Sequence, residues 1–185
     1  MKNQIFYSFI FFLIISCSQP VKVEFNLKNL SDSINSKEAD LKRTEILLPG
    51  NSLAIEIIQL YKQFADSFPN EKDAPQYLFK AANVSIGVRQ FQPAISFLER
   101  IKKYYAEYEK SPESLFLMAF IYDNYLDQKG KAREIYQEVI DTYPSHKFAS
   151  DAKEVIKTLE MTDEELIKMF EEKEKENSLA KGKGK

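Results

Sequence analysis

The sequence of 185 residues predicts an all-α protein made of stacked helical hairpins, which together form a short α-solenoid. Two observations lead to this prediction. Apolar residues recur at the i, i+3, i+4, i+7 spacing of a helix face over most of residues 51–160. Segments within this stretch also resemble one another at a period of about 37 residues, a length typical of helix pairs that stack on their neighbours.

The first segment, residues 1–16, has the features of a signal peptide. One lysine at position 2 precedes an apolar run over residues 5–15 that a single serine interrupts. A helix of this length spans roughly 16 Å, whereas the hydrocarbon core of a bilayer is about 30 Å thick. The run is therefore too short for a transmembrane helix and is typical of the apolar region of a signal peptide.

The apolar run ends in Ile14, Ile15, Ser16 and Cys17, which resembles the lipobox of bacterial lipoproteins. The resemblance implies cleavage before Cys17 and attachment of acyl chains such as palmitate at this residue. Two or three such chains hold a protein firmly at a membrane, and Ser18 after the cysteine favours the outer membrane, facing the periplasm. The alternative is an ordinary secretory signal in which the only cysteine of the chain is incidental.

Residues 17–50 are predicted to be a lipidated N-terminus followed by a flexible tether. Hydrophobic periodicity is weak here, and serine, asparagine and aspartate gather over residues 31–36. One short helix is expected over residues 38–47, before the breaker residues at 48–51.

From residue 51 onward the pattern predicts one helix after another. Prolines and N-caps mark several ends; the Ser111-Pro112 pair, for example, is typical of a helix start. The expected helices cover residues 51–68, 75–88, 94–108, 112–126, 132–143 and 146–160.

The internal repeat resembles the tetratricopeptide repeat. Residues 78–82 match 115–119, and residues 94–98 match 132–136. Small residues stand where the paired helices of that motif touch, and a proline closes one unit: Ala82, Ala94, Ala119, Ala132 and Pro144. The sequence departs from the motif at Leu78, Ser85, Ala106 and Leu115.

The resemblance places tetratricopeptide-like repeats over residues 51–160. The 51–68 helix is interpreted as the second half of a degenerate first unit, and the other units are expected at 72–107, 112–144 and, as a half unit, 146–160. A capping box at residues 162–165 opens a helix that is expected to cap the solenoid over 161–176, and the Lys/Gly tail at 177–185 is expected to be disordered.

Residues 132–152 are more closely similar to the repeat-bearing envelope lipoproteins. These include BamD of the outer-membrane β-barrel assembly machinery, and the periplasmic division coordinator CpoB carries related repeats. The shared feature is a run of spaced alanines and tyrosines around a Tyr-Pro-Ser turn.

Composition and spacing argue against several classes of function. A formal net charge of −2 does not favour a nucleic-acid partner. His146 is the single histidine, so neither a Ser-His-Asp nor a Cys-His arrangement can be assembled, and carboxylate pairs such as Glu171-Glu172 are typical of solvated helix faces. We therefore predict no enzyme activity, no metal site, no cofactor beyond the lipid on Cys17, and no small-molecule substrate.

The sequence predicts a binding groove instead, because stacked helix pairs present the first helix of each pair on one face. Carrying the groove-facing positions of the repeat across predicts a groove lined by Gln76, Phe79, Asn83, Ile86, Glu113, Phe116, Phe120 and Asp123. The alternative is that the phenylalanines among them pack in the core, which the spacing also predicts for Tyr104, Tyr105 and Tyr108.

The sequence thus predicts a non-catalytic, lipid-anchored adaptor of the bacterial cell envelope that binds proteins. Two alternatives remain open: a subunit of an outer-membrane β-barrel assembly complex, and an accessory that regulates an envelope hydrolase.

Overall fold

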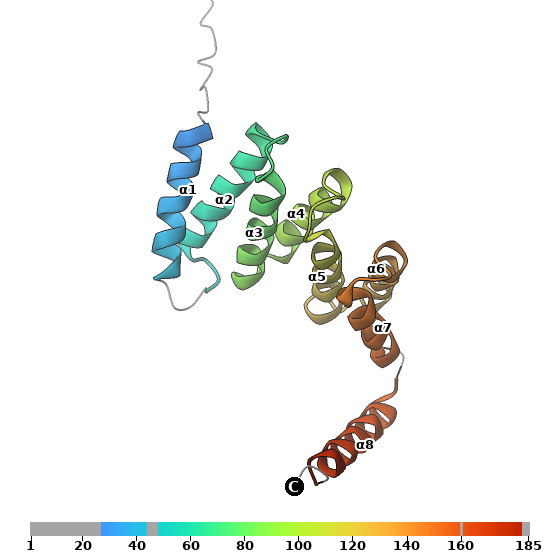
Figure 1. Ribbon diagram of the computed structural model, residues 1–185. Coiled ribbons are helices and arrows are strands. Elements are labelled where there is room, and N and C mark those ends of the chain that lie inside the picture. The colour runs from blue at the N-terminus through green and yellow to red at the C-terminus, as the bar shows by residue number, and fades with distance from the viewer. Residues whose placement is uncertain (1–26, 44–47, 160, 183–185) are drawn as a thin grey trace, which may run out of the picture.

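The computed structural model describes residues 27–43, 48–159 and 161–182, and the described residues form eight helices and no strand (Figure 1). The predicted signal peptide, the lipobox and Cys17 lie outside the described residues. No described helix is long and apolar enough to span a membrane. The helices are α1 (Leu27–Lys42), α2 (Ser52–Ser67), α3 (Ala74–Gly87), α4 (Phe91–Tyr104), α5 (Ser111–Asn124), α6 (Lys129–Thr142), α7 (Lys147–Leu159) and α8 (Asp163–Gly182).

Helices α1 to α7 pack side by side in chain order, each on the next, whereas α8 stands apart (Figure 1). This stacking confirms the predicted all-α solenoid. The predicted contact alanines Ala82, Ala94, Ala119 and Ala132 are completely buried. Their small side chains let the backbones of paired helices approach closely, and larger residues such as Leu98 and Tyr136 fill the remaining space.

The turn between α3 and α4 and the turn between α5 and α6 reverse the chain in the same way. Arg89 follows α3 with φ 61°, and Asp127 follows α5 with φ 51°. In each turn the backbone N–H of the next residue donates to a carbonyl of the preceding helix. Gln90 donates to the Ser85 carbonyl at 2.7 Å, and Gln128 donates to the Tyr122 carbonyl at 2.8 Å. A left-handed residue beyond a helix end satisfies its last carbonyls and turns the chain back.

The predicted tether is wrong over residues 27–42, because they form α1 and pack on α2. Leu30 and Ile34 are buried, and Leu41 packs against the same core. These apolar residues are few and lie among serines and asparagines, so the local sequence pattern does not reveal the helix. Packing on α2 stabilises it. The helix expected at 38–47 overlaps only the end of α1, and α1 with α2 makes a complete first pair where half a unit was predicted.

The C-terminal helix begins as predicted but differs in extent and position. The capping box is present: the Thr162 N–H donates to Glu165 Oε2 at 2.9 Å, and the Glu165 N–H donates to Thr162 Oγ1 at 3.3 Å. The helix continues to Gly182, through residues expected to be disordered; it follows a segment rich in the good helix formers Glu and Lys, and Leu179, Ala180 and Lys181 extend it. It extends away from α7, so it does not cover the end of the stack as a cap would (Figure 1).

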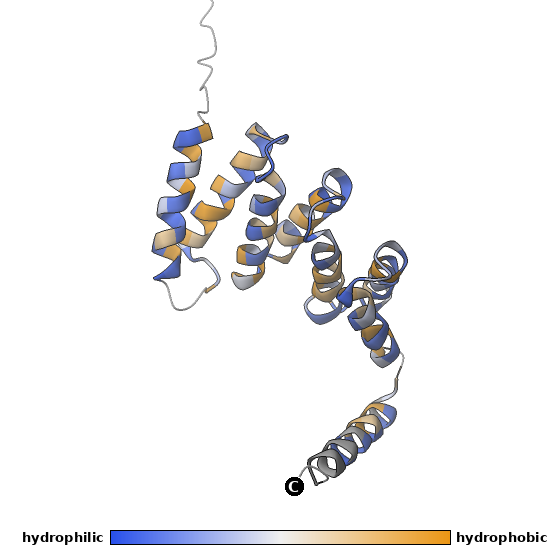
Figure 2. Cartoon of the chain, in the orientation of Figure 1, coloured by the Kyte–Doolittle hydropathy of each residue, from blue (hydrophilic) through white to orange (hydrophobic). Residues whose placement is uncertain are grey.

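The hydrophobic residues gather where neighbouring helices of the stack face one another (Figure 2). One continuous core runs from Leu30 on α1 to Ala152 on α7. None of the described side chains of α8 is buried. The stack therefore behaves as one body, α1–α7, and α8 as an arm; we use these two names below.

Candidate protein-binding surface

Four of the predicted groove residues lie on α3. Gln76 and Asn83 are exposed and Ile86 is half-buried, whereas Phe79 is only 8% exposed and belongs to the core. The Asn83 side-chain amide donates to the Phe79 carbonyl, one turn earlier, at 2.9 Å. These four residues of α3 thus present the polar side chains of Gln76 and Asn83 to solvent on either side of the buried Phe79 ring.

The other four predicted residues lie on α5, and two of them are aromatic rings in packed pairs. Phe116 meets Tyr136 of α6 edge-on with ring centroids 5.1 Å apart, and its centroid lies 5.0 Å from that of Phe148 on α7. Phe120 meets Tyr125 edge-on at 5.8 Å. Phe116 therefore joins three helices, and Phe120 remains half-buried near the end of α5.

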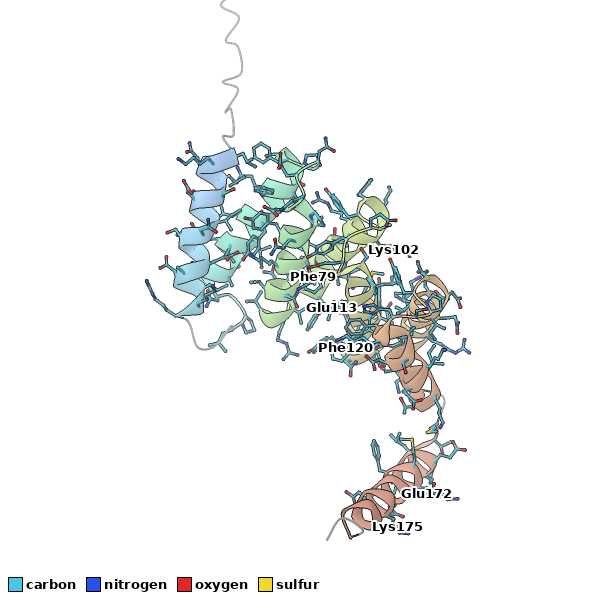
Figure 3. All side chains as sticks on the ribbon, in the orientation of Figure 1. Phe79, Lys102, Glu113, Phe120, Glu172 and Lys175 are labelled. Atoms are coloured by element: carbon cyan, nitrogen blue, oxygen red, sulfur yellow. The ribbon has the colours of Figure 1, made fainter. Side chains whose placement is uncertain are left out.

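The segment between α4 and α5 contacts the predicted groove residues of α3. Lys110 places its Nζ 4.9 Å from the ring centre of Phe79, a distance at which a cation is attracted to the face of an aromatic ring. Figure 3 shows Phe79 on α3 with Glu113 and Phe120 along α5. Glu113 and Asp123 are half-buried, and burial raises the pKa of Asp123, although Lys129 acts in the opposite direction.

We call these eight residues of α3 and α5 the α3–α5 face. The structure buries Phe79 and packs Phe116 between helices, so the exposed groups Gln76 and Asn83 are the better candidates for direct contact with a partner. That this face binds a protein stays a prediction.

A pocket of about 700 Å³ adjoins the α3–α5 face and was not foreseen from the sequence. It lies between the start of α3 and the loop that joins α4 to α5, and it shares Gln76 with the face. The pocket is lined by Lys72, Pro75, Gln76, Tyr104, Tyr105, Ala106, Glu107, Tyr108 and Glu109.

Three tyrosines give this pocket an aromatic wall. The prediction that Tyr104 is a core residue is wrong: the residue is 63% exposed, because it is the last of α4 and lies beyond the stack. Tyr105 and Tyr108 are half-buried against the core, and the Tyr105 hydroxyl donates to the Pro69 carbonyl at 2.9 Å. Helical spacing alone does not reveal where α4 ends, so it did not separate Tyr104 from its neighbours.

An ion cluster lies on the side of this pocket toward α2. Asp66 accepts from Lys62 at 2.6 Å and from Arg100 of α4 at 2.9 Å. Burial works against the charged form of Asp66, yet the two cations together hold the pKa of its carboxyl below the usual value. The pair with Arg100 ties α4 to α2. Lys102 of α4, labelled in Figure 3, likewise pairs with Glu138 of α6 at 2.6 Å, so the second helices of successive pairs are linked.

A second cluster attaches α1 to the body. The Glu38 carboxylate accepts from the Tyr61 hydroxyl at 2.9 Å and from Lys80 Nζ at 2.7 Å. Lys80 Nζ also lies 5.3 Å from the ring centre of Tyr77, which stacks on Tyr61 at 5.5 Å. Burial, and then the bond to Glu38, raise the pKa of the Tyr61 phenol far above its usual value, so the hydroxyl stays a donor. These contacts join α1, α2 and α3.

With this geometry in place, comparison with known proteins identifies the repeat. The family model for the tetratricopeptide repeat matches residues 113–146, which cover all but the first two residues of α5, the whole of α6 and the turn that follows. No curated protein matches the chain. The family match and the helix pairs on both sides of it support a tetratricopeptide-type protein, and repeats of this type generally bind proteins and serve as non-catalytic scaffolds.

The single histidine has a packing role in this structure. The His146 ring stacks on Phe148 with centroids 5.4 Å apart, and its Nδ1 accepts from the Phe148 N–H at 3.3 Å. Within the described part of the chain, no three His, Cys, Asp or Glu side chains are grouped so that they could hold a metal ion.

Proposed function

We propose that the chain is a non-catalytic scaffold that binds protein partners through the α3–α5 face and its tyrosine pocket. The observation that carries the proposal is the tetratricopeptide match over α5 and α6, next to a surface with exposed polar groups and an aromatic hollow. Shallow aromatic hollows suit the large apolar side chains that dominate protein interfaces. Gln76 and Asn83, whose amides both donate and accept, suit the backbone groups of an extended segment.

The composition of the pocket indicates the kind of segment that fits. The tyrosines would take an apolar or aromatic side chain, because such rings supply a large contact area at a small cost in conformational entropy. Lys72 on one side, and Glu107 and Glu109 on the other, would set the direction of a segment that carries charges of both signs.

We further propose that the scaffold is a lipoprotein of the bacterial envelope, anchored through Cys17. The lipobox-like residues 14–17 support this proposal. Because α1 starts at Leu27, nine residues separate it from Cys17, and nine residues reach at most about 32 Å. Such an anchor would hold the body close to the membrane surface, with α1 nearest to it.

Cell fractionation tests the anchor. The Cys17→Ala variant is expected to move from the membrane fraction into the soluble envelope fraction, because the thiol that would carry the lipid is absent. A variant that stays with the membranes would show that the lipid assignment is wrong.

Crosslinking in cells, followed by affinity capture from the membranes and mass spectrometry, tests the scaffold. Recovery of β-barrel assembly proteins would favour a subunit of that machinery, which the similarity of residues 132–152 to BamD suggests. Recovery of a cell-wall hydrolase would favour a regulatory accessory.

Matched variants connect the captured protein to the surface. Gln76→Lys with Asn83→Lys changes two exposed residues of the α3–α5 face, and Ser96→Lys changes an exposed residue of α4 as a control. We expect the first variant to lose about tenfold or more of the captured partner and the control to retain it, with unchanged circular dichroism in both. Equal capture by both variants would show that the face is not the binding surface.

A further inference from the structure

The tyrosine pocket contains hydrogen-bond donors that the body does not use. Within the described residues, neither the Tyr104 hydroxyl, the Tyr108 hydroxyl nor the Gln76 side-chain amide has a hydrogen-bond partner. Burial, with Glu109 and Glu113, raises the pKa of Tyr108 to about 12, so this hydroxyl stays protonated and able to donate. A segment that brings free acceptors into the pocket therefore finds donors already in place.

Two tyrosine rings stand between the pocket and a second hollow. Tyr104 and Tyr105 line the tyrosine pocket of about 700 Å³, and they also line an adjoining hollow of about 420 Å³ that extends toward the Asp66–Arg100 ion pair. Tyr104 is 63% exposed, so its ring is accessible to a partner. A surface of this shape accepts two side chains of one segment, one on each side of the rings.

The unused donors and the ring wall favour one backbone conformation in the bound segment. An α-helix bonds its own carbonyls internally, and a β-strand pairs with a sheet edge, whereas the described residues form no strand. A polyproline II helix has no internal hydrogen bonds, so all of its carbonyls are free to accept. It also presents a side chain on the same face every third residue, about 9 Å apart, and it suits grooves lined by aromatic rings.

The loop after α4 adds negative charge to one wall of the pocket. Glu107 and Glu109 line the pocket and are exposed, and neither forms an ion pair within the described part of the chain. Among the described residues that line the pocket, Lys72 is the only cation, and it comes from the other wall, before α3. A basic side chain at the glutamate wall is therefore attracted, and its charge complements the surface.

We propose that the tyrosine pocket and the adjoining hollow bind a proline-rich segment of a partner protein, in polyproline II conformation, with an arginine or lysine beside the prolines. The proline rings pack against Tyr104 and Tyr105, the unused donors meet the free carbonyls, and the basic side chain pairs with Glu107 or Glu109. This inference rests on the proposed function, because it names the kind of segment that the scaffold recognises.

The test is the binding of dye-labelled peptides to the full chain, purified in detergent, measured by fluorescence polarisation at low salt. The probe has six prolines between two arginines, and the prolines span roughly 19 Å, or two turns. One comparison peptide replaces the prolines with alternating glycine and serine, and another is an alanine-rich helical peptide of the same charge. The proline peptide is expected to bind at least about tenfold more tightly than either, because its conformation is fixed before binding.

Equal affinities for the three peptides would overturn the proposal, and so would a preference for the helical peptide, which would identify a helix as the occupant. Either result would leave the α3–α5 face itself to the capture experiment, in which Gln76→Lys with Asn83→Lys is compared with Ser96→Lys. The failure of this inference is thus distinguishable from the failure of the proposed function.

Variants of the exposed Tyr104 separate the ring from its hydroxyl. Tyr104→Ala is expected to weaken the proline peptide by about tenfold, because the aromatic contact is lost, and Tyr104→Phe by about threefold, because only a donor is lost. Tyr125→Ala is the matched control, since Tyr125 is 43% exposed and lies at the end of α5, outside the pocket. Unchanged binding in Tyr104→Ala, or an equal loss in Tyr125→Ala, would contradict the assignment.

The glutamate wall is tested by changing both sides of the expected ion pair. Glu107→Gln with Glu109→Gln is expected to weaken the arginine-flanked proline peptide by about fivefold at low salt, and less at high salt, because exposed charges are screened. The same variant is expected to bind a glutamine-flanked proline peptide as well as the unchanged protein does. Equal losses for the two peptides would overturn the role of the basic side chain.

Discussion

The body and the arm are both helical, yet different interactions hold them. Every helix from α1 to α7 contributes buried residues to one continuous core, whereas no described side chain of α8 is buried. The arm depends on its capping box and on the helix propensity of its residues. The difference shows that helical periodicity identifies a helix but does not determine what the helix packs against.

The first and largest expected effect separates the two regions by core deletion. Leu98 is 1% exposed in the body, and Leu98→Ala should lower the free energy of unfolding by about 2–5 kcal/mol, through lost burial and the cavity that remains. Ile167→Ala in the arm should change it by less than about 0.5 kcal/mol. Urea unfolding followed by tyrosine fluorescence measures both. Similar losses from the two substitutions would mean that α8 is part of the folding unit.

The second effect concerns how α1 is held on the body. Tyr61→Phe keeps the ring stacked on Tyr77 but removes the hydroxyl that donates to Glu38. We expect a loss of about 1.5–3 kcal/mol, the usual net value of a hydrogen bond to a charged group. Hydrogen exchange should show it as faster exchange in α1, with little change in α5 and α6. Unchanged exchange in α1 would show that the Glu38 cluster does not hold this helix.

The third effect is confined to the arm. Thr162→Ala removes the hydroxyl that caps α8 and should cost about 0.5–1 kcal/mol of local helix stability. Hydrogen exchange in residues 163–175 should accelerate severalfold, while exchange in the body stays the same. A drop in the stability of the body would contradict the separation of the two regions.

The smallest effect is a pH dependence that only the body should have. Burial, with Glu109 and Glu113, raises the pKa of Tyr108 to about 12. The unfolded chain releases this proton near pH 10, so the folded state binds more protons between pH 10 and about 12. The contribution of Tyr108 to stability is therefore complete below pH 10 and is lost as the pH rises through this window. Tyr108→Phe should lessen the decline of urea stability with rising pH, and an identical decline in both proteins would contradict this assignment.

The regularity of the stack could be predicted from the sequence, and its ends could not. The repeated alanines and the proline turns define the central pairs because each unit meets the same neighbours. At the ends those neighbours are missing. Leu30 and Ile34 are too sparse to indicate a helix until α2 covers them, and the apolar residues of α8, such as Ile167 and Phe170, do not reveal by their spacing that they stay exposed.

The predicted surface shows the same limit. The resemblance to the repeat assigned eight groove residues, and the structure places them on α3 and α5, but the resemblance did not determine which of them are exposed. Phe79 is covered by Lys110, which comes from the loop after α4, so its burial depends on a distant segment. The tyrosine pocket was missed for a related reason, since its wall is formed where α4 ends.

The most direct test of the account is photo-crosslinking in cells, because it asks whether the α3–α5 face of the body meets a partner protein. p-Benzoylphenylalanine would replace Gln76 or Asn83 on the α3–α5 face, or Ser96 on α4 as the control. We predict adducts to a different protein from the first two positions and none from Ser96. Equal yields from Gln76, Asn83 and Ser96 would contradict the account.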